Sequence, residues 1–238
     1  MKPNRPAGST ATPADDRPNN AQTLARRLWL RGAALGAALP AAFAHAQAAA
    51  RRVTPTQSLG PFYPRSAAEM PAETDADLLG AQGDRILAKG TPLYLTGRVV
   101  TRAGQPVANA LVEIWQCDAN AVYHHPAGGG ESARDPNFQG YGTARCDADG
   151  VFHFRTIKPV AYPGRTPHIH MRVASPVGTV ATQWYLPNEP GNARDFLYRS
   201  LSAAEQAALT LALREGEPAT HPLARSTRVS ARVEVVVG

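Results

Sequence analysis

The segment from Tyr162 to Arg172 concentrates side chains that bind metals and anions, with a phenol, guanidinium groups and two imidazoles. Its sequence, Tyr-Pro-Gly-Arg-Thr-Pro-His-Ile-His-Met-Arg, predicts a turn followed by a strand. Side chains alternate between the faces of a strand, so His168, His170 and Arg172 share one face. The opposite face is apolar and is predicted to join the core, through Ile169, Met171 and Val173. The polar face is a candidate metal site.

A His-x-His pair does not identify a metal site by itself. Neutral imidazoles also lie hydrogen-bonded in ordinary sheets, and such pairs bind zinc, copper or iron in unrelated folds. A second tyrosine, Tyr123, lies upstream in a polar loop that follows the apolar run Val112–Trp115. Loops on a rigid scaffold often carry chemistry. Tyr123, Tyr162 and the two histidines together make a coherent ligand set.

The hardness of these ligands indicates which metal they suit. A phenol has an unperturbed pKa of about 10 and binds poorly until a highly charged cation removes its proton. Hard anionic oxygen combined with imidazole nitrogen therefore favours ferric iron. Zinc fits less well, because catalytic zinc sites use histidine, cysteine and carboxylate rather than paired phenolates.

A series of motifs in a fixed order carries a resemblance to a known family. They are Thr54–Tyr63, Gly97–Val100, Gly104–Gln116, Asp135–Gly140, Phe152–Pro159 and the segment from Tyr162 to Arg172. Over roughly residues 54 to 200 the chain resembles the intradiol ring-cleavage dioxygenases, and most closely the type of protocatechuate 3,4-dioxygenase beta subunits. An ordered series of this kind is far more specific than any single motif.

The resemblance implies a role for each ligand residue. Tyr123 and Tyr162 would be tyrosinate ligands, and His168 and His170 imidazole ligands, of a non-haem Fe(III) that a solvent hydroxide completes to five-coordination. Tyr162 corresponds to the tyrosine that leaves the iron when substrate binds. The implied reaction uses O2 to cleave a catechol-type ring between its two hydroxylated carbons, which gives a cis,cis-muconate-type diacid.

Two further residues match family positions near the substrate. Arg165 precedes His168 by three residues, and a permanent cation there would stabilise negative charge that develops on the ring. Gln183 matches a glutamine near the O2 and substrate pocket, and Tyr185 shares its strand face. A surface arginine and an ordinary pair of sheet residues are the alternatives. By the same analogy, Gly60–Tyr63 would line the pocket.

Other polar residues near these motifs have simpler explanations. His124 and His125 follow Tyr123 directly, and we expect them to be solvent-exposed or to contact the ligand residues rather than the metal. Arg172 is expected to form a salt bridge or to cap the sheet.

The N-terminal part of the chain is predicted to be an export signal rather than part of the fold. Residues 1–25 are rich in Pro, Asn and Ala, and Arg26-Arg27 then precede a weakly hydrophobic stretch from Gly32 to Ala44. This order is typical of a twin-arginine signal, with Ala44-His-Ala46 as a small-x-small cleavage site and Ala46-Gln-Ala48 as a second choice. We therefore expect a periplasmic or secreted protein. An uncleaved disordered arm or an amphipathic anchor is the alternative.

Charge and length bound the partners of the remaining chain. The formal net charge of +6 falls to +2 once residues 1–46 are removed, so the basic character gives little support for nucleic-acid binding. No uninterrupted apolar run is long enough to span a membrane. We expect a soluble protein whose partners are a catecholic small molecule and O2, assembled as a homo-oligomer, with a hetero-oligomer as the alternative.

The two cysteines, Cys117 and Cys146, both lie near the predicted site residues. In an oxidising compartment they could form a disulfide, which would stabilise the fold by about 3 kcal/mol. Two separate buried thiols are the equal alternative, because spacing does not show whether the Cα atoms are close enough.

The rest of the chain predicts an all-β domain over residues 47–238, an antiparallel β-sandwich of the Ig-like or prealbumin-like kind, with long loops that carry the metal site. A helix is predicted at Ser202–Arg214 and a single helical turn at Asp75–Leu79. The strands are predicted at Leu93–Val100, Ala110–Gln116, Gly150–Ile157, His168–Ala174, Val180–Leu186 and Thr227–Val237. The loop Ala119–Gly142 is long enough to suggest a functional role.

Two other classes of function remain open from the sequence. Gly97–Val100 followed by Gly104–Ala110 also resembles the opening of small β-sandwich binding modules without catalysis, although such modules have no need for two tyrosines and two histidines together. A hydrolase could hold a different metal at the same histidine pair. That enzyme would need a general base and would be colourless, whereas ferric tyrosinate absorbs visible light.

Overall fold

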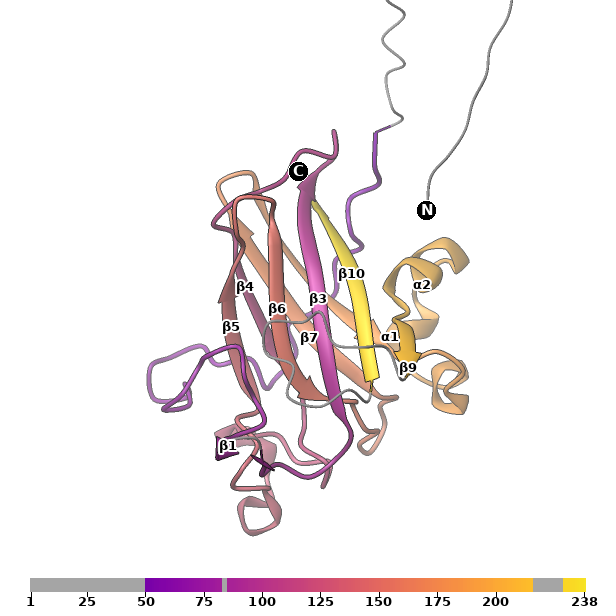
Figure 1. The fold of residues 1–238 in the computed structure, drawn as a ribbon. Coiled ribbons are helices and arrows are strands. Elements are labelled where there is room, and N and C mark those ends of the chain that lie inside the picture. The colour runs from indigo at the N-terminus through magenta and orange to yellow at the C-terminus, as the bar shows by residue number, and fades with distance from the viewer. Residues whose placement is uncertain (1–49, 83–84, 216–228) are drawn as a thin grey trace, which may run out of the picture. The chain divides into compact units, whose positions relative to one another are not determined.

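The computed structural model describes residues 50–82, 85–215 and 229–238, which form a mostly β structure with two four-stranded sheets and few helices (Figure 1). The predicted export signal, its cleavage site and the predicted start of the domain at residue 47 lie outside these residues. Among the described residues, no helix is long and apolar enough to cross a membrane.

The first sheet has the strand order β6-β3-β10-β9. Its strands are β3 (Pro92–Thr101), β6 (Val151–Ile157), β9 (Ala212–Glu215) and β10 (Val229–Val237). β3 pairs antiparallel with β6 but parallel with β10, in register from Leu93 and Val229 onward. The expectation of a wholly antiparallel sandwich is therefore wrong at this pair, because the spacing of strands along a sequence does not show which strands become neighbours.

The second sheet has the order β5-β4-β7-β8 and is antiparallel throughout. Its strands are β4 (Leu111–Trp115), β5 (Tyr141–Arg145), β7 (His168–Ser175) and β8 (Gly178–Tyr185). Trp115 on β4 and Gln183 on β8 both stand opposite His170 on β7. Side chains of residues that pair across strands lie on the same face. One face of this sheet therefore presents Trp115, His170 and Gln183 in a row.

The core lies between the two sheets. Ile169, Met171 and Val173 from β7 are fully buried in it, as the alternation along this strand predicts. Leu95 and Val235 contribute from the other sheet. Since the core takes one face of the second sheet, the polar side chains on the opposite face are left to form a site.

All six predicted strands are present, with ends shifted by one or two residues. For the last of them, residues 227–228 lie outside the described part. Two short edge strands, β5 and β9, and the small hairpin of β1 (Ala81–Gln82) and β2 (Arg85–Ile86) were not among the predicted strands. Edge strands have weaker patterns because fewer of their residues are buried.

Both helix predictions need correction. The helix α2 covers only Ala203–Leu209, capped by Ser202 as expected, because the chain after Thr210 is extended and pairs with β10. The predicted turn at Asp75–Leu79 is not helical; its backbone bonds to Arg155 on β6 instead. In both places tertiary pairing outweighs local helix propensity.

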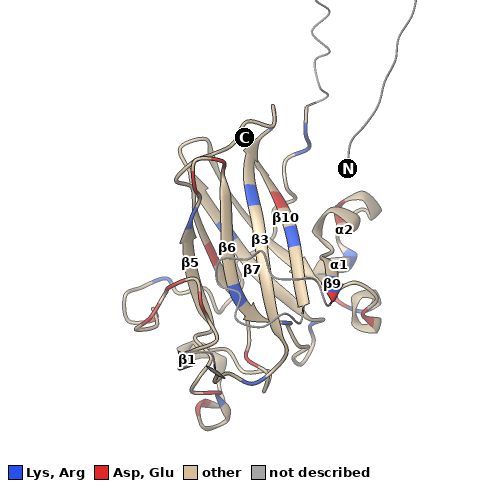
Figure 2. Ribbon diagram, in the orientation of Figure 1, with Lys and Arg blue, Asp and Glu red and all other residues tan. Residues whose placement is uncertain are grey.

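Short helical segments connect the strands near the predicted site. They are the unpredicted α1 (Phe196–Arg199) and the 3-10 turns η1 (Pro126–Gly128), η2 (Glu131–Ala133) and η3 (Pro190–Ala193). Acidic and basic residues are interspersed along the described ribbon (Figure 2). On β10, for example, exposed Glu234 pairs in register with Arg98 of β3.

The segment that precedes Tyr63 is tied to both sheets. The backbone N–H of Thr54 donates to the carbonyl of Val236 at 3.1 Å, and that of Gln57 donates to the carbonyl of Ala181 at 2.8 Å. These bonds bring the following residues, including Gly60, against the polar face of the second sheet.

Candidate metal centre

A tight turn places Tyr162 and Arg165 at the start of β7. The backbone N–H of Arg165 donates to the carbonyl of Tyr162 at 2.9 Å, and Gly164 takes the left-handed φ of +83° that this turn needs. The phenol and the guanidinium therefore emerge from the two ends of one turn. The Nη1 atom of Arg165 lies 3.4 Å from the Tyr162 hydroxyl.

His168 and His170 project from the polar face of β7 and are each 2% exposed. Their Nε2 atoms lie 3.2 Å apart. His168 Nδ1 lies 2.7 Å from the carbonyl of Thr166, which accepts but cannot donate, so the proton of the neutral ring sits on Nδ1. His168 Nε2 is therefore left with a free lone pair that points at the space shared with His170.

Tyr123 reaches the same space from the loop after β4. Its hydroxyl lies 3.4 Å from His168 Nε2. The fully buried Asp118 shapes this loop: one carboxylate oxygen accepts from the backbone N–H groups of Asn120 and Val122, and the other accepts from Asp135. Because Asp118 is buried and its two oxygens accept these bonds, it fixes the loop that carries Tyr123.

Aromatic side chains enclose the four candidate ligands. Phe62 stacks on Tyr123, with ring centroids 4.2 Å apart, and Tyr162 packs edge-on against Tyr123 at 5.4 Å. Trp115 stacks on His170 at 4.8 Å with the ring planes within 6°. Gly60 closes the site, since a Cβ there would lie 3.4 Å from Cε1 of His170.

Burial sets the protonation of the four groups in the metal-free protein. It raises the pKa of Tyr123 well above 10 and also raises the pKa of Tyr162, while the Arg165 cation opposes both shifts. Burial lowers the pKa of His168 to about 4 and lowers the pKa of His170 well below 6.5, with Arg165 adding to both effects. At neutral pH the site thus holds two neutral imidazoles and two phenols that ionise only beside a strong cation.

This donor set fits a ferric ion. Ligand atoms bound to one metal at about 2 Å are separated by about 3 Å, which is close to the spacing of the two Nε2 atoms and the Tyr123 hydroxyl. Two phenolates would neutralise two of the three charges of Fe(III), and paired phenolate with imidazole suits a hard ion.

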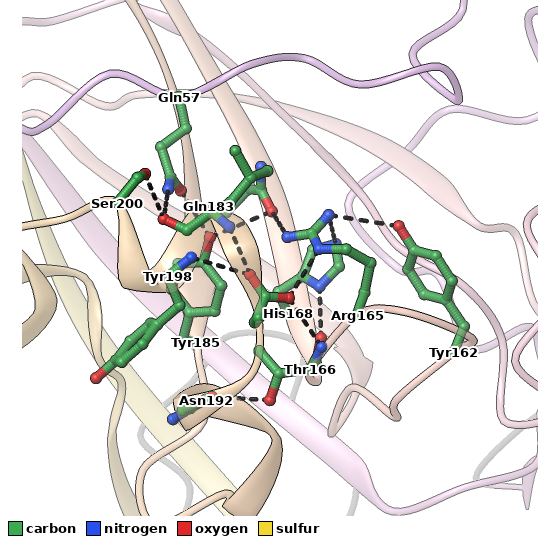
Figure 3. A network of polar contacts seen from close by, with 12 residues as sticks. Gln57, Tyr162, Arg165, Thr166, His168, Gln183, Tyr185, Asn192, Tyr198 and Ser200 are labelled. Carbon is green, nitrogen blue, oxygen red and sulfur yellow. Dashed lines mark hydrogen bonds and ion pairs between the residues drawn. The ribbon is translucent and has the colours of Figure 1, made fainter.

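A polar network surrounds the guanidinium of Arg165 (Figure 3). Its Nη2 donates to Oε1 of Gln183 at 2.7 Å, and its Nε donates to Asp195 at 2.8 Å. The hydroxyl of Tyr185 donates to Gln57 at 2.9 Å and lies 3.5 Å from Oε1 of Gln183. The structure thus brings all the predicted site residues together, with Gln183 joined to the centre through Arg165.

The two histidines after Tyr123 point elsewhere. Nε2 of His124 lies 3.2 Å from Asp118, and His125 accepts from the backbone N–H of Ala127 while its Nε2 lies 3.6 Å from Glu69. Arg172 forms an ion pair with Glu113, one of the two roles expected for it. Both cysteines are free and buried, so the separate thiols, and not the disulfide, are present in the structure.

Sequence reasoning missed three contributors to the site. Trp115 was noted only as part of a motif, although its place opposite His170 would follow from the pairing of their strands. Asp195 precedes Phe, Leu and Tyr and is recognisable from the sequence as a helix N-cap. That pattern does not indicate a contact with Arg165. The carbonyl of Thr166 carries no sequence signal, because any residue supplies one.

Comparison with known proteins agrees with this geometry. A protein-family model described as dioxygenase matches residues 59–225, which is most of the chain. The chain belongs to the intradiol dioxygenase family. The match covers every candidate ligand of the intradiol dioxygenase site, together with Arg165, Gln183 and Asp195. It leaves Gln57 outside.

Curated intradiol relatives include the protocatechuate 3,4-dioxygenase beta chain of Burkholderia cepacia, 38% identical over 124 residues, which are 48% of this chain and 53% of that one. The 6-chlorohydroxyquinol 1,2-dioxygenase of Cupriavidus pinatubonensis is 39% identical over 107 residues, 37% of each chain. The present chain therefore spans about half of these relatives' length or less.

A solved structure described as the dioxygenase domain of a dioxygenase carbohydrate-binding protein fusion from Streptomyces sp. SirexAA-E has a TM-score of 0.58 and is 28% identical. The match covers 78% of this chain and 98% of that one. The hydroxyquinol 1,2-dioxygenase of Pseudomonas putida DLL-E4 has a TM-score of 0.59, covers 78% and 66% of the two chains, and at 23% identity shows the shared intradiol dioxygenase fold.

Proposed function

We propose that this chain is a non-haem Fe(III)-dependent intradiol dioxygenase, which uses O2 to cleave a catechol-type ring between its two hydroxylated carbons and gives a cis,cis-muconate-type diacid. The convergence of two phenols and two imidazoles on one buried point carries this proposal. Tyr123, Tyr162, His168 and His170 would hold the iron. When bound, the ferric ion would lower the pKa of both catechol hydroxyls and accept electron density from the ring.

The environments of the two tyrosines differ and suggest different tasks. Tyr123 is 4% exposed and is held by Phe62 and by its loop, so its oxygen is expected to stay in place. Tyr162 is partly exposed on a turn. We assign to the Tyr162 oxygen the removal of one proton from the arriving catechol, after which this side chain moves aside.

Arg165 would supply fixed positive charge beside the reacting ring. Burial of its guanidinium acts to lower the pKa, but the hydrogen bond and ion pair with Asp195 outweigh this and raise the pKa, so Arg165 stays protonated at any relevant pH. A fixed cation near a centre where negative charge develops stabilises the transition state more than the ground state. Gln183 contacts this cation, and we place it at the edge of the substrate pocket.

We propose a catecholic small molecule and O2 as the partners of the site. The names of the curated relatives support this class, since they act on protocatechuate, 6-chlorohydroxyquinol and catechol.

We propose that the protein forms a homo-oligomer, with a hetero-oligomer as the alternative. Static light scattering of the purified chain alone tests the oligomeric state. We also propose that the two packed sheets form a sandwich of the Ig-like or prealbumin-like kind.

We further propose that residues 1–46 direct twin-arginine export to the periplasm or beyond. Arg26-Arg27 ahead of a Gly/Ala-rich stretch and a small-x-small site support this. N-terminal sequencing of the exported protein should begin at residue 47, or at residue 49 if the second site is used. Replacing both arginines by lysine should retain the precursor in the cytoplasm, and unchanged export of that variant would contradict the proposal.

Ring cleavage itself is tested with iron-loaded protein and isotopic oxygen. With catechol, protocatechuate or hydroxyquinol as substrate, we expect one molecule of 18O2 to be consumed per ring and both labelled atoms to appear in the diacid. Mass spectrometry of the product measures this. Absence of oxygen uptake with all three substrates, in protein shown to contain iron, would contradict the proposed function.

A further inference from the structure

Each nitrogen of the Arg165 guanidinium faces a defined partner. Nε donates to Oδ2 of Asp195 at 2.8 Å, and Nη2 donates to Oε1 of Gln183 at 2.7 Å. The third nitrogen, Nη1, lies 3.4 Å from the Tyr162 hydroxyl and 3.5 Å from Nε2 of His168. The two short bonds on one edge therefore fix the direction in which Nη1 points, as Figure 3 shows for Gln183 and Tyr162.

Asp195 divides its two carboxylate oxygens between two tasks. Oδ1 accepts from the backbone N–H groups of Leu197 and Tyr198 at 3.0 and 2.9 Å and so caps α1. Oδ2 accepts from Arg165 and from the backbone N–H of Thr166 at 3.0 Å. The residue is 2% exposed. The carboxylate thus accepts four hydrogen bonds. Two of them, from Arg165 and Thr166, hold the segment just before β7.

Capping alone does not require a buried anion here. The helix α1 has only four residues and buries none of them, and a neutral serine or asparagine caps a helix as well as aspartate does. The charge of Asp195 instead matches that of Arg165, whose side chain is 9% exposed. A buried cation needs a hydrogen-bonded counter-ion, and Asp195 supplies one outside the metal centre.

If this counter-ion is lost, the side chain of Arg165 has an alternative position beside Phe196. Its Cζ lies 5.4 Å from the ring centroid of Phe196, which is 65% exposed. A guanidinium released from Asp195 would gain water and keep contact with this ring, and Nη1 would turn away from Tyr162. Asp195 therefore opposes a movement that the surroundings would otherwise allow.

We propose that Asp195 is a positioning residue that holds the Arg165 guanidinium with Nη1 aimed at the metal centre, and that this is a role separate from its capping of α1. The inference rests on the proposed function. Gln57 supports the same arrangement from the other side: its Nε2 donates to the carbonyl of Leu197 at 3.3 Å, and its Oε1 accepts from Tyr185. The segment before β1 is thereby linked to α1.

The test compares Asp195→Asn and Asp195→Ser in iron-loaded protein. Both side chains can still cap α1, but neither carries the charge that holds Arg165. We expect kcat to fall about 10- to 100-fold with KM changed less than about threefold, because an interaction made in the transition state is weakened. The visible tyrosinate-to-iron band should move to longer wavelength, since a donor to the Tyr162 oxygen is displaced.

Ser202→Ala is the matched control, because it removes the cap of α2 and the hydrogen bonds of Ser202 are made with Glu205 rather than with Arg165. It should lower the unfolding temperature and leave kcat and the visible band unchanged. A double-mutant cycle gives a second measurement. If Asp195 acts through Arg165, adding Asp195→Asn to Arg165→Gln should change kcat by less than about twofold.

The outcomes separate the two proposals. If both Asp195 variants keep kcat and the visible band of the wild type and differ from it only in stability, as Ser202→Ala does, Asp195 caps α1 and the positioning role is wrong. Full additivity in the double-mutant cycle also overturns that role. If the wild-type protein binds no iron and cleaves no catechol ring, the proposed function is wrong, and the positioning role with it.

Discussion

Trp115 lies flat on the imidazole of His170, with ring centroids 4.8 Å apart and the planes within 6°. The indole is 1% exposed, and its Nε1 has no hydrogen-bond partner among the described residues. Trp115 therefore acts on the site through its ring area alone. The stacked ring holds His170, a candidate iron ligand, in one orientation without a hydrogen bond.

Trp115→Phe should weaken both the fold and the hold on iron. Phenylalanine keeps a smaller stack and loses no hydrogen bond, so we expect a loss of about 1–2 kcal/mol in the free energy of unfolding, whereas Trp115→Ala should cost about 3–5 kcal/mol. Urea unfolding of the metal-free protein measures this. Competition with a chelator should show faster loss of iron from both variants.

Trp184→Phe provides the control for this prediction. Trp184 is similarly buried but lies on the core face of β8, where its Nε1 contacts the sulfur of Met171 at 3.2 Å. Its replacement should destabilise the fold without speeding the loss of iron. Equal rates of iron loss in the Trp184 and Trp115 variants would show that the stack on His170 has no specific effect.

Tyr162→Phe should remove one phenolate and with it most turnover. The fold should persist, since Tyr162 is only partly buried, and the change in unfolding free energy should stay near 1 kcal/mol. We expect kcat to fall at least about 100-fold and the visible band to change shape. Tyr198→Phe is the matched control: its side chain is also partly buried, and its hydroxyl lies 3.3 Å from Oγ1 of Thr210 rather than beside the four ligands. Full turnover with an unchanged spectrum in Tyr162→Phe would refute its assignment.

The metal-free protein should lose stability as pH falls from about 6.5 to 4. His168 titrates near 6.5 when unfolded, but burial lowers its pKa to about 4 when folded, so the unfolded chain binds a proton that the folded chain does not. His170 shifts in the same direction. The His168 effect is fully present above pH 6.5 and would amount to about 3 kcal/mol. Urea unfolding at pH 7 and pH 4.5 measures the loss, and His168→Gln should reduce it.

Both thiols should be unreactive while the protein is folded. Burial raises the pKa of Cys117 to about 12 and that of Cys146 to about 11, so almost no thiolate is present at pH 8. We expect a disulfide reagent such as DTNB to label neither cysteine in native protein and both in urea. Rapid labelling of native protein, lost in Cys117→Ser, would show that the site opens to solvent more than the structure indicates.

The sequence predicted the parts of the fold and the site that depend on local pattern. Alternation along β7 separated Ile169 and Met171 from the two histidines, and the donor types selected a ferric ion. Contacts between distant segments were not predictable in this way. Asp195 and Gln57 reach Arg165 and its neighbours only because α1 and the N-terminal segment fold against the second sheet. The parallel pairing of β10 with β3 depends on the same long-range packing.

The central claim, that two tyrosines and two histidines hold a catalytic ferric ion, is tested most directly by the visible spectrum of iron-loaded protein during anaerobic titration with catechol. We predict a burgundy resting protein whose tyrosinate-to-iron band shifts as catechol binds and decays when O2 is admitted. A protein that contains stoichiometric iron, yet is colourless and unchanged by catechol, would contradict the claim.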